Sequence, residues 1–203
     1  MLTSLTCSWS AERTVPGRFE MAEADALDTS CIGAIHRDDS DWLALTAEPI
    51  QETEVRKWLT HPACGAVVIF AGTVRVNSPG HQDVRSIRYE VHHSLAMRQL
   101  SEIATATHAR WSDAVKVSML HRFGDVPLGA TSVLVGCAAP HRATAFAAAE
   151  FMIDLIKQVM PVWKLEHSAS ATAWSACTTD IVPVSTAVGS WRRRCPNGET
   201  VAI

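Results

Sequence analysis

The hydrophobic and polar positions of the first third of the chain predict a strand, a helix and a second strand. Asp41–Ile50 contains a short apolar run that is typical of a strand. Gln51–Gly65 has apolar residues at helical spacing, followed by helix-ending proline and glycine. These apolar residues are Val55, Trp58 and Leu59. Gly65–Arg75 is apolar and β-branched without alternation, which predicts a strand covered on both faces.

The next segments predict a loop, an alternating strand and a helix. Val76–Asp83 carries Ser-Pro-Gly and polar residues and is a predicted loop. Val84–Val91 alternates, so it predicts a strand with two distinct faces. One face would carry Val84, Ser86, Arg88 and Glu90, and the other Arg85, Ile87, Tyr89 and Val91. Ser94 is the predicted N-cap of a helix that ends near Arg110. Its inward side would carry Leu95, Leu100, Ile103, Ala104 and Thr107.

The second half predicts two strands and one long helix. Ala114–Gly124 and Ser132–Ala138 are strand candidates joined through a turn at Pro127–Gly129. Ala139–Glu166 then predicts one long apolar helix with cationic residues at both ends, which Pro161 stops. From Ser168 the periodicity is low.

The order β-α-β-β-α-β-β-α favours an α+β fold with a mixed or mostly antiparallel sheet. The 203 residues, 47% of them hydrophobic, suffice for one sizeable core and suit one domain better than two. Residues 1–30 lack the apolar region of a secretory signal, so we expect a flexible leader. Residues 31–175 form the predicted domain, and 176–203 a C-terminal tail.

The composition excludes several classes of function. The net charge of −3 gives no global basic field for nucleic acid or anionic membranes, so any anion site must be local. No apolar run reaches the roughly 18 residues of a membrane span. The six cysteines are scattered without C-x-x-C or zinc spacing, which favours reduced thiols in the cytoplasm and predicts no metal or other cofactor.

The start of the long helix is a candidate anion site. A helix N-terminus offers unpaired N–H groups and a partial positive charge, and His141 and Arg142 add side-chain donors there. The alternative is an arginine paired with a nearby carboxylate and a histidine on the surface. Cys137, just upstream, could be a nucleophile near His141, but a cysteine in an apolar strand is more often a packed small residue.

The end of the helix carries two lysines with two possible roles. Lys157 can simply complement the helix dipole, the usual role of a cation at a helix end. Alternatively, Trp163 walls a pocket beside the Lys164 amine, whose lost hydration lowers its pKa and favours nucleophilic or acid–base chemistry. Arg75 ends the strand before the Gly/Pro loop, which is a common ligand-binding position as well as a common solvated terminus.

The length of the helix separates these groups. Arg142 and Lys157 are fifteen positions apart, which places them roughly 22 Å apart along the axis. One small ligand cannot reach both ends within one chain. Either the two ends serve different purposes, or one site combines the helix start of one subunit with the helix end of another. The second option predicts a dimer.

Three segments together resemble the MoaE family, the large, catalytic subunit of molybdopterin synthase. They are "IFAGTVR", "LHRFGDVPLGATSVLVGCAAPHRATAF" and "MIDLIKQVMPVWKLE". The resemblance covers about Asp41 to Trp174 and includes the patterns H-R-x-x-A-F and D-x-x-K-x-x-x-P-x-W-K-x-E. It implies an α/β hammerhead-like fold with an additional antiparallel β subdomain.

The resemblance also implies an activity and partners. Family members convert cyclic pyranopterin monophosphate (precursor Z) into molybdopterin in molybdenum cofactor synthesis. The dithiolene sulfur comes from the C-terminal thiocarboxylate of a small ubiquitin-like, MoaD-type subunit. The family assembles as a heterotetramer around a dimer of large subunits.

Carried over by motif, the resemblance makes Lys157 and Lys164 the catalytic pair. The residues that it implies for substrate binding are Thr73, Val74, Arg75, His141, Arg142, Leu165 and Glu166. The sequence departs from the family pattern at Leu165, where members often carry a second basic residue, and after Trp174, where an arginine is missing. Two alternatives are a catalytically inactive pterin-phosphate binding or regulatory module of the same fold and a homodimeric phosphoester hydrolase that uses His141.

Overall fold

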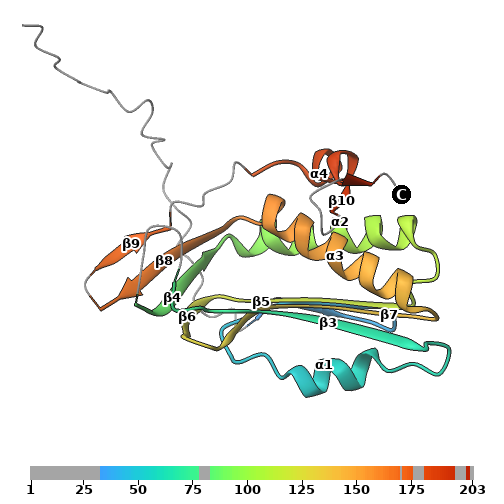
Figure 1. Cartoon of the computed structure of the whole chain (residues 1–203), viewed down its shortest axis with the longest axis horizontal. Helices are drawn as coiled ribbons and strands as arrows, with labels where there is room; N and C mark the ends of the chain where they lie inside the picture. The colour runs from blue at the N-terminus through green and yellow to red at the C-terminus, as the bar shows by residue number, and fades with distance from the viewer. Residues whose placement is uncertain (1–32, 78–82, 170, 176–180, 195–199, 202–203) are drawn as a thin grey trace, which may run out of the picture. The chain divides into compact units, whose positions relative to one another are not determined.

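The computed structural model describes residues 33–77, 83–169, 171–175, 181–194 and 200–201. The predicted leader, 1–30, lies outside these ranges, as do the central residues of the predicted loop Val76–Asp83. The described part is mixed α+β, as predicted, with one five-stranded sheet, one four-stranded sheet and four helices (Figure 1).

The larger sheet has the strand order β1-β2-β5-β7-β3. Strands β2 and β5 are parallel, and the other neighbours are antiparallel. The strands are β1 (Ile35–Arg37), β2 (Asp41–Thr46), β3 (Ala66–Thr73), β5 (Lys116–Arg122) and β7 (Thr131–Ala139). Helix α1 (Glu52–Leu59) covers one face, whereas α2 (His93–Arg110) and α3 (Arg142–Val159) cover the other (Figure 1).

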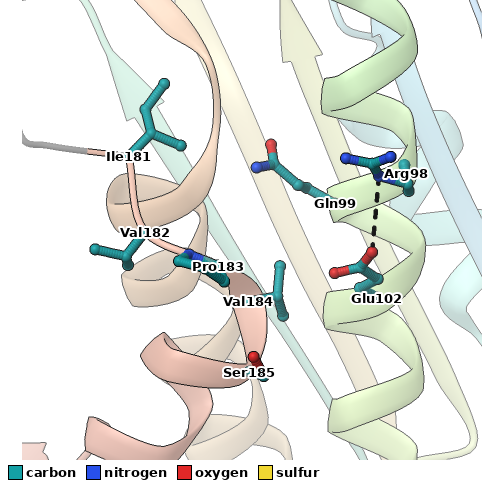
Figure 2. Close-up of a pocket in the computed structure, with 8 residues that line it drawn as sticks. All are labelled: Arg98, Gln99, Glu102, Ile181, Val182, Pro183, Val184 and Ser185. Atoms are coloured by element: carbon teal, nitrogen blue, oxygen red, sulfur yellow. Dashed lines mark ion pairs between the residues drawn. The ribbon is translucent and has the colours of Figure 1, made fainter.

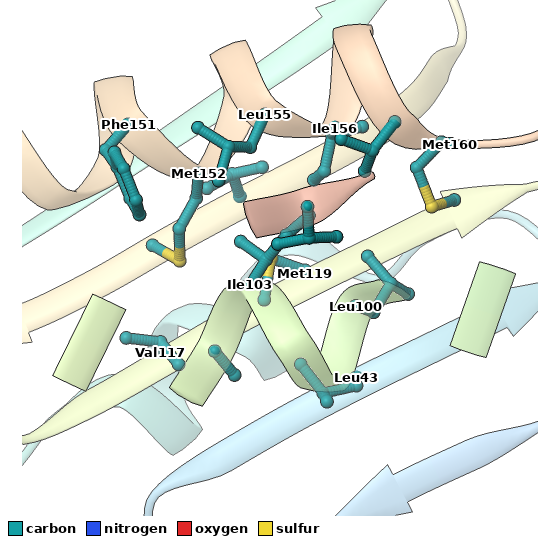
Figure 3. Close-up of a cluster of buried hydrophobic side chains, with 14 of the residues drawn as sticks. Leu43, Leu100, Ile103, Val117, Met119, Phe151, Met152, Leu155, Ile156 and Met160 are labelled. Atoms are coloured by element: carbon teal, nitrogen blue, oxygen red, sulfur yellow. The ribbon is translucent and has the colours of Figure 1, made fainter. Parts of the chain in front are cut away.

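Successive side chains of the central strands point to opposite faces of the sheet and pack into two hydrophobic cores. Met119 faces the α2–α3 layer, whereas its neighbour Leu120 packs with α1. Figure 3 shows Met152 and Leu155 of α3 pointing toward Ile103 of α2 and the sheet beneath. Each such fully buried side chain contributes about 1.5–3 kcal/mol to folding. Because helices cover both faces of the sheet, β5 and β7 are continuously apolar in sequence.

Strand β3 has the same sequence character but a different position. It is the edge strand beside β7, and its residues are only half-buried or exposed, with Phe70 41% exposed. The prediction that Gly65–Arg75 is covered on both faces is therefore wrong for a single chain. An apolar, β-branched run does not distinguish a central strand from an edge strand that another surface covers.

The smaller sheet, with order β6-β4-β8-β9, is entirely antiparallel. Its strands are β4 (Val84–Val91), β6 (Gly124–Pro127), β8 (Val162–Ser168) and β9 (Thr172–Trp174). Val84, Ile87 and Tyr89 are all buried because the register with β8 shifts between Val84 and Ser86. The predicted alternation is thus correct for Ile87 and Tyr89 but wrong for Val84, since a bulge changes the phase.

The predicted long helix is two elements. Helix α3 ends at Val159, and β8 begins at Val162, so Lys164 lies on a strand and not on a helix. Pro161 favours an extended residue before it, and Met160 has ψ 128°. The predicted N-cap Ser94 is also wrong, because the cap of α2 is His92, whose Nδ1 accepts from the Leu95 N–H at 3.4 Å.

The segment after Ser168 contains elements that its low periodicity did not predict. They are β9, α4 (Val184–Ser190), β10 (Arg193–Arg194) and β11 (Thr200–Val201). Just after α4, the buried Trp191 donates its indole N–H to Asp154 of α3 at 3.0 Å and meets Phe151 edge-on at 5.1 Å. Among the described residues, no helix is long and apolar enough to cross a membrane.

A charged pair joins the end of α2 to the start of β2. His108 donates from Nε2 to Asp41 at 2.7 Å and from Nδ1 to the Ala114 carbonyl at 3.1 Å. Both ring nitrogens therefore face acceptors, which favours the imidazolium. The hydrogen bond to Asp41 raises the pKa of His108 above its ordinary value, against the opposing effect of burial.

We predict that this pair stabilises the fold at acidic to neutral pH and not at alkaline pH. A raised histidine pKa gives stability that is complete below the unfolded value of 6.5 and is lost as pH rises through the folded value. A His108→Gln variant should lose about 1 kcal/mol at pH 6. Urea unfolding of both proteins should show this difference in unfolding free energy shrinking from pH 6 to 9, because His108 loses its proton. Other groups titrate alike in both proteins, so their effects cancel in the difference. A difference that is constant or grows with pH would contradict the pairing.

Candidate active site

The two lysines meet where the chain turns from α3 into β8. Lys157 lies in the last turn of α3, and Lys164 lies seven residues later on β8. Between them, the Val162 N–H donates to the Met160 carbonyl at 2.8 Å, and the His92 N–H donates to the Pro161 carbonyl at 3.2 Å. These bonds fix the turn, so the two amines lie at one end of the larger sheet.

Electrostatics show that the two amines influence each other. Loss of hydration, together with the nearby charge of Lys164, lowers the pKa of Lys157 to about 8. The Lys157 residue is exposed as a whole, but protein atoms crowd around its side chain and replace part of its water. An amine with this pKa both gives and accepts protons near neutral pH.

His121, at the end of β5, is a third basic group in this cluster and was not predicted as a site residue. Its ring is buried, and Nδ1 lies 2.7 Å from the Arg122 carbonyl oxygen. Burial lowers the pKa of His121 to about 4, and the charges of Lys157 and Lys164 contribute to the lowering. The imidazole is therefore neutral beside two ammonium groups.

Tyr89 joins Lys164 to His121. It stands opposite Lys164 in the β4–β8 register, so their side chains share one face of the smaller sheet. Its ring meets the His121 ring edge-on, with centroids 5.4 Å apart. Trp163, the predicted wall beside Lys164, instead lies on the opposite face of β8 and is 41% exposed. The aromatic neighbours of the amine are thus Tyr89 and His121.

The Tyr89 hydroxyl connects the two sheets. It hydrogen-bonds to Ser132 of β7, whose own hydroxyl donates to the Gly72 carbonyl of β3 at 3.0 Å. Burial raises the pKa of Tyr89, and the carboxylate of Glu166 adds to the effect, so the phenol stays protonated. Glu166 is buried and shares the Lys164 face of β8, whereas Leu165 is half-buried on the other face.

The predicted strand end on β3 lies at the same end of the sheet as the lysines. Thr73 stands opposite Thr131 at the start of β7, and the Val74 N–H donates to the Ala130 carbonyl at 3.1 Å. Val74 is buried, and Arg75 is exposed. Because β3 and α3 both run opposite to β7, the end of β3 and the end of α3 lie at the start of β7 (Figure 1).

His141 and Arg142 lie at the other end. His141 is the N-cap of α3, with no side-chain capping bond, and both residues are exposed. The 18-residue helix α3 separates them from Lys157. Within one chain the structure thus gathers Lys157, Lys164, Glu166 and the Thr73–Arg75 strand end, and it separates His141 and Arg142 from them.

Other candidate groups do not join this cluster. Cys137 is buried, and burial raises the pKa of its thiol to about 12, so the preferred interpretation of a packed small residue is correct. A group that the sequence did not reveal, His36, Asp38 and Asp41, has possible metal-ligating atoms within 4.8 Å of one another. Hydrogen bonds from His36 and His108 and from backbone N–H groups account for this arrangement.

A cavity of about 380 Å³ lies between α2 and the segment that enters α4 (Figure 2). Gln99 points into it from α2, and its Oε1 has no hydrogen-bond partner. Arg98 and Glu102 flank Gln99 and form an ion pair at 3.8 Å. None of the site residues predicted from the sequence lines this cavity.

Comparison with known proteins identifies the family of this chain. The family model described as MoaE protein matches residues 45–159, which include β3, His121, His141, Arg142 and Lys157. The chain belongs to the MoaE family. The family segment ends before β8, so Lys164 and Glu166 lie just outside the matched range.

Curated and solved relatives extend the MoaE likeness. The molybdopterin synthase catalytic subunit of Culex quinquefasciatus is 35% identical over 67% of this chain and 86% of its own length. Catalytic subunit 1 of Mycobacterium tuberculosis is 38% identical over 64% of this chain and 87% of its own. The crystal structure of molybdopterin synthase from Staphylococcus aureus superposes with a TM-score of 0.62 at 29% identity, covering 70% of this chain and 99% of that one.

The ionisation of Lys157 gives a direct test of the amine cluster. We predict an NMR titration midpoint of about 8 for Lys157 in the isolated MoaE-family chain, measured on ¹⁵N- and ¹³C-labelled side chains. Lys164→Ala should raise this midpoint, because it removes a neighbouring positive charge. Lys57→Ala, on the opposite face of the sheet, is the matched control and should leave it unchanged. A wild-type midpoint near the ordinary 10.5 would refute the cluster.

Proposed function

We propose that the chain is the large, catalytic subunit of a molybdopterin synthase, a sulfurtransferase of molybdenum cofactor biosynthesis. It transfers sulfur from the C-terminal thiocarboxylate of a small ubiquitin-like, MoaD-type partner to cyclic pyranopterin monophosphate, forming the molybdopterin dithiolene. MoaE membership supports this proposal. The single structural observation that carries it is the pairing of Lys157 and Lys164 across the α3–β8 turn, with a lowered pKa at Lys157.

The amine pair suits this chemistry. A thiocarboxylate brings negative charge to the site, and two ammonium groups stabilise it and any anionic intermediate that forms on the substrate. Lys157, with a pKa of about 8, can also move protons near neutral pH. Lys164 is placed by β8 beside Tyr89 and Glu166, which gives it a fixed direction.

Cationic residues are needed to bind the substrate phosphate, and the resemblance implies which residues these are. Arg75 lies at the lysine end of the larger sheet, whereas His141 and Arg142 lie at the other. A pterin monophosphate is far shorter than the roughly 22 Å between Arg142 and Lys157 along α3. We therefore propose that His141 and Arg142 reach the site from a second copy of the chain, with Thr73, Val74, Leu165 and Glu166 completing it.

The edge strand β3 is suited to such a dimer. It is apolar and half-exposed, and α3 packs on β7 and β3, close to this edge. Two β3 strands paired antiparallel about a two-fold axis would run in opposite directions. The lysine end of one copy would then lie beside the α3 start of the other. Two such chains with two small partners make the proposed heterotetramer, which we place in the cytoplasm.

Loss of either lysine tests the activity. Lys157→Ala and Lys164→Ala should fold normally and each lower molybdopterin formation by about two orders of magnitude or more, because transition-state charge loses its stabilisation. The assay combines the variant, thiocarboxylated small subunit and precursor Z, and detects molybdopterin by its oxidised fluorescent derivative. Lys57→Ala is the control with normal turnover. Near-normal rates in both site variants would refute the assignment.

Subunit complementation tests the shared site. Lys157→Ala and Arg142→Ala are each expected to be inactive alone. In a hybrid dimer, one of the two sites would combine the intact lysine of one chain with the intact arginine of the other. Co-expressing both variants should therefore restore about a quarter of the wild-type rate, since about half of randomly formed dimers are hybrids. If the site lies within one chain, the co-expressed mixture will stay inactive.

A further inference from the structure

Trp191, which follows α4, is held in place by an aromatic cluster. Its side chain is buried, and its ring meets Phe151 of α3 edge-on and lies 6.1 Å from the Trp111 ring. The Arg110 guanidinium lies 5.1 Å from the same ring. These contacts fix the direction of an indole, which has a single hydrogen-bond donor. That donor, Nε1–H, points at the Asp154 carboxylate of α3, with a nitrogen-to-oxygen distance of 3.0 Å.

Asp154 and Lys157 are the two ends of the D-x-x-K pattern on α3. Residues three apart on a helix are neighbours on its surface, and an aspartate and a lysine at this spacing can form an ion pair. Among the described residues, however, no ion pair joins these two. The groups that shift the pKa of Lys157 include no carboxylate. The bond from the indole therefore holds a carboxylate that could otherwise pair with the amine.

The other charged side chains around the end of α3 come from three elements. They are Lys164 and Glu166 of β8, His121 of β5, and Arg98, Glu102 and Arg110 of α2, whereas α4 carries none. Arg98 and Glu102 pair with each other at 3.8 Å. On α3 itself, the cation nearest to Asp154 in sequence is Lys157. A released Asp154 carboxylate would therefore find this amine as its neighbouring cation along the helix.

We propose that Trp191 is a positioning residue: its indole N–H holds the Asp154 carboxylate and so keeps the Lys157 amine free for the anionic substrate. This inference rests on the proposed function and adds a residue to it. An amine paired with Asp154 would hold its proton more firmly, and its charge would be partly neutralised before a thiocarboxylate arrived. Trp191 lies beyond residues 45–159, which the family model matches.

Two variants and a control separate the hydrogen bond from the packing. Trp191→Phe keeps an aromatic ring against Phe151 and removes the N–H, which releases the Asp154 carboxylate. The double variant Trp191→Phe/Asp154→Asn also removes the negative charge, so the ion pair with the amine cannot form. Trp111→Phe is the matched control, because Trp111 belongs to the same aromatic cluster and its indole donates no hydrogen bond to any described residue.

The experiment measures two quantities on each variant. The first is the NMR titration of Lys157 in the isolated chain, without partner or substrate. Trp191→Phe should raise the midpoint by about half a unit, because a carboxylate now stabilises the charged amine, and the double variant should return it to the wild-type value. The second is molybdopterin formation. Trp191→Phe should lower kcat about three- to tenfold with little change in KM, and the double variant should recover it.

Asp154→Asn alone gives a test that leaves the aromatic cluster intact. The amide oxygen can still accept from the indole N–H, and the lost negative charge is one that does not pair with Lys157 in the wild-type chain. The Lys157 midpoint should therefore stay near its wild-type value. A fall of about half a unit would mean that the ion pair already exists in the wild-type chain, and it would overturn the proposal.

Recovery in the double variant, with Trp111→Phe behaving as wild type, supports the proposal. With an active wild type, an unchanged midpoint or an unchanged rate in Trp191→Phe overturns it. An equal shift in the single and double variants also overturns it, because lost packing and not the carboxylate would then move the amine. If wild type forms no molybdopterin but the midpoint shifts and recovers as expected, the proposed function fails and the restraint of Asp154 by Trp191 stands.

Discussion

The turn at Pro161 is the constraint on which the candidate site depends. Proline has no N–H to continue helix α3, and it forces the residue before it into an extended conformation. The chain therefore leaves the helix layer and enters the smaller sheet within three residues of Val159. Lys157 remains on the helix while Lys164 is carried by a strand, so two cations that a longer helix would space apart converge. Hydrogen bonds of Met160 and Pro161 hold this geometry.

This convergence costs electrostatic free energy, and the cost lowers the pKa values of the least hydrated groups most. Bringing two ammonium groups and a buried imidazole together favours loss of protons, and the least hydrated groups lose them first. His121 becomes neutral, and Lys157 moves toward neutrality. An anionic ligand would reverse the tendency, because it stabilises every positive charge near it. In a chain of net charge −3, such a local concentration of cations is consistent with a site for an anionic group.

Much of the fold could be predicted from periodicity, and the failures share a physical reason. The pattern identified α1, α2, β4, β5 and β7 because each buries one face or both against its own chain. It identified β3 as a strand but wrongly gave it cover on both faces, since an apolar run does not distinguish a central strand from an edge strand. It failed at Lys164, because Val162–Glu166 continues the apolar character of α3 and only Pro161 marks the change. It also missed β9 and α4, which are short.

The residues of the candidate site could be proposed from the sequence where a motif carried them and not where packing did. The two lysines follow from the D-x-x-K and P-x-W-K pattern, and the separation of Arg142 from Lys157 follows from helix rise alone. His121 and Tyr89 had no such signal, because each stands in an apolar or alternating strand like an ordinary core residue. Their placement near Lys164 comes from cross-strand register and from the packing of one sheet on another, which is information that a linear pattern does not contain.

The contact between Trp191 and Asp154 links the C-terminal segment to the same helix. Asp154 precedes Lys157 by three residues, which is less than one helical turn. Its carboxylate accepts the hydrogen bond from the Trp191 indole N–H, and Phe151 packs edge-on against the indole ring. The segment after α4 thus braces the stretch of α3 that carries Lys157. A change at Trp191, remote in sequence from any motif, would therefore act on the helix turn that holds this lysine.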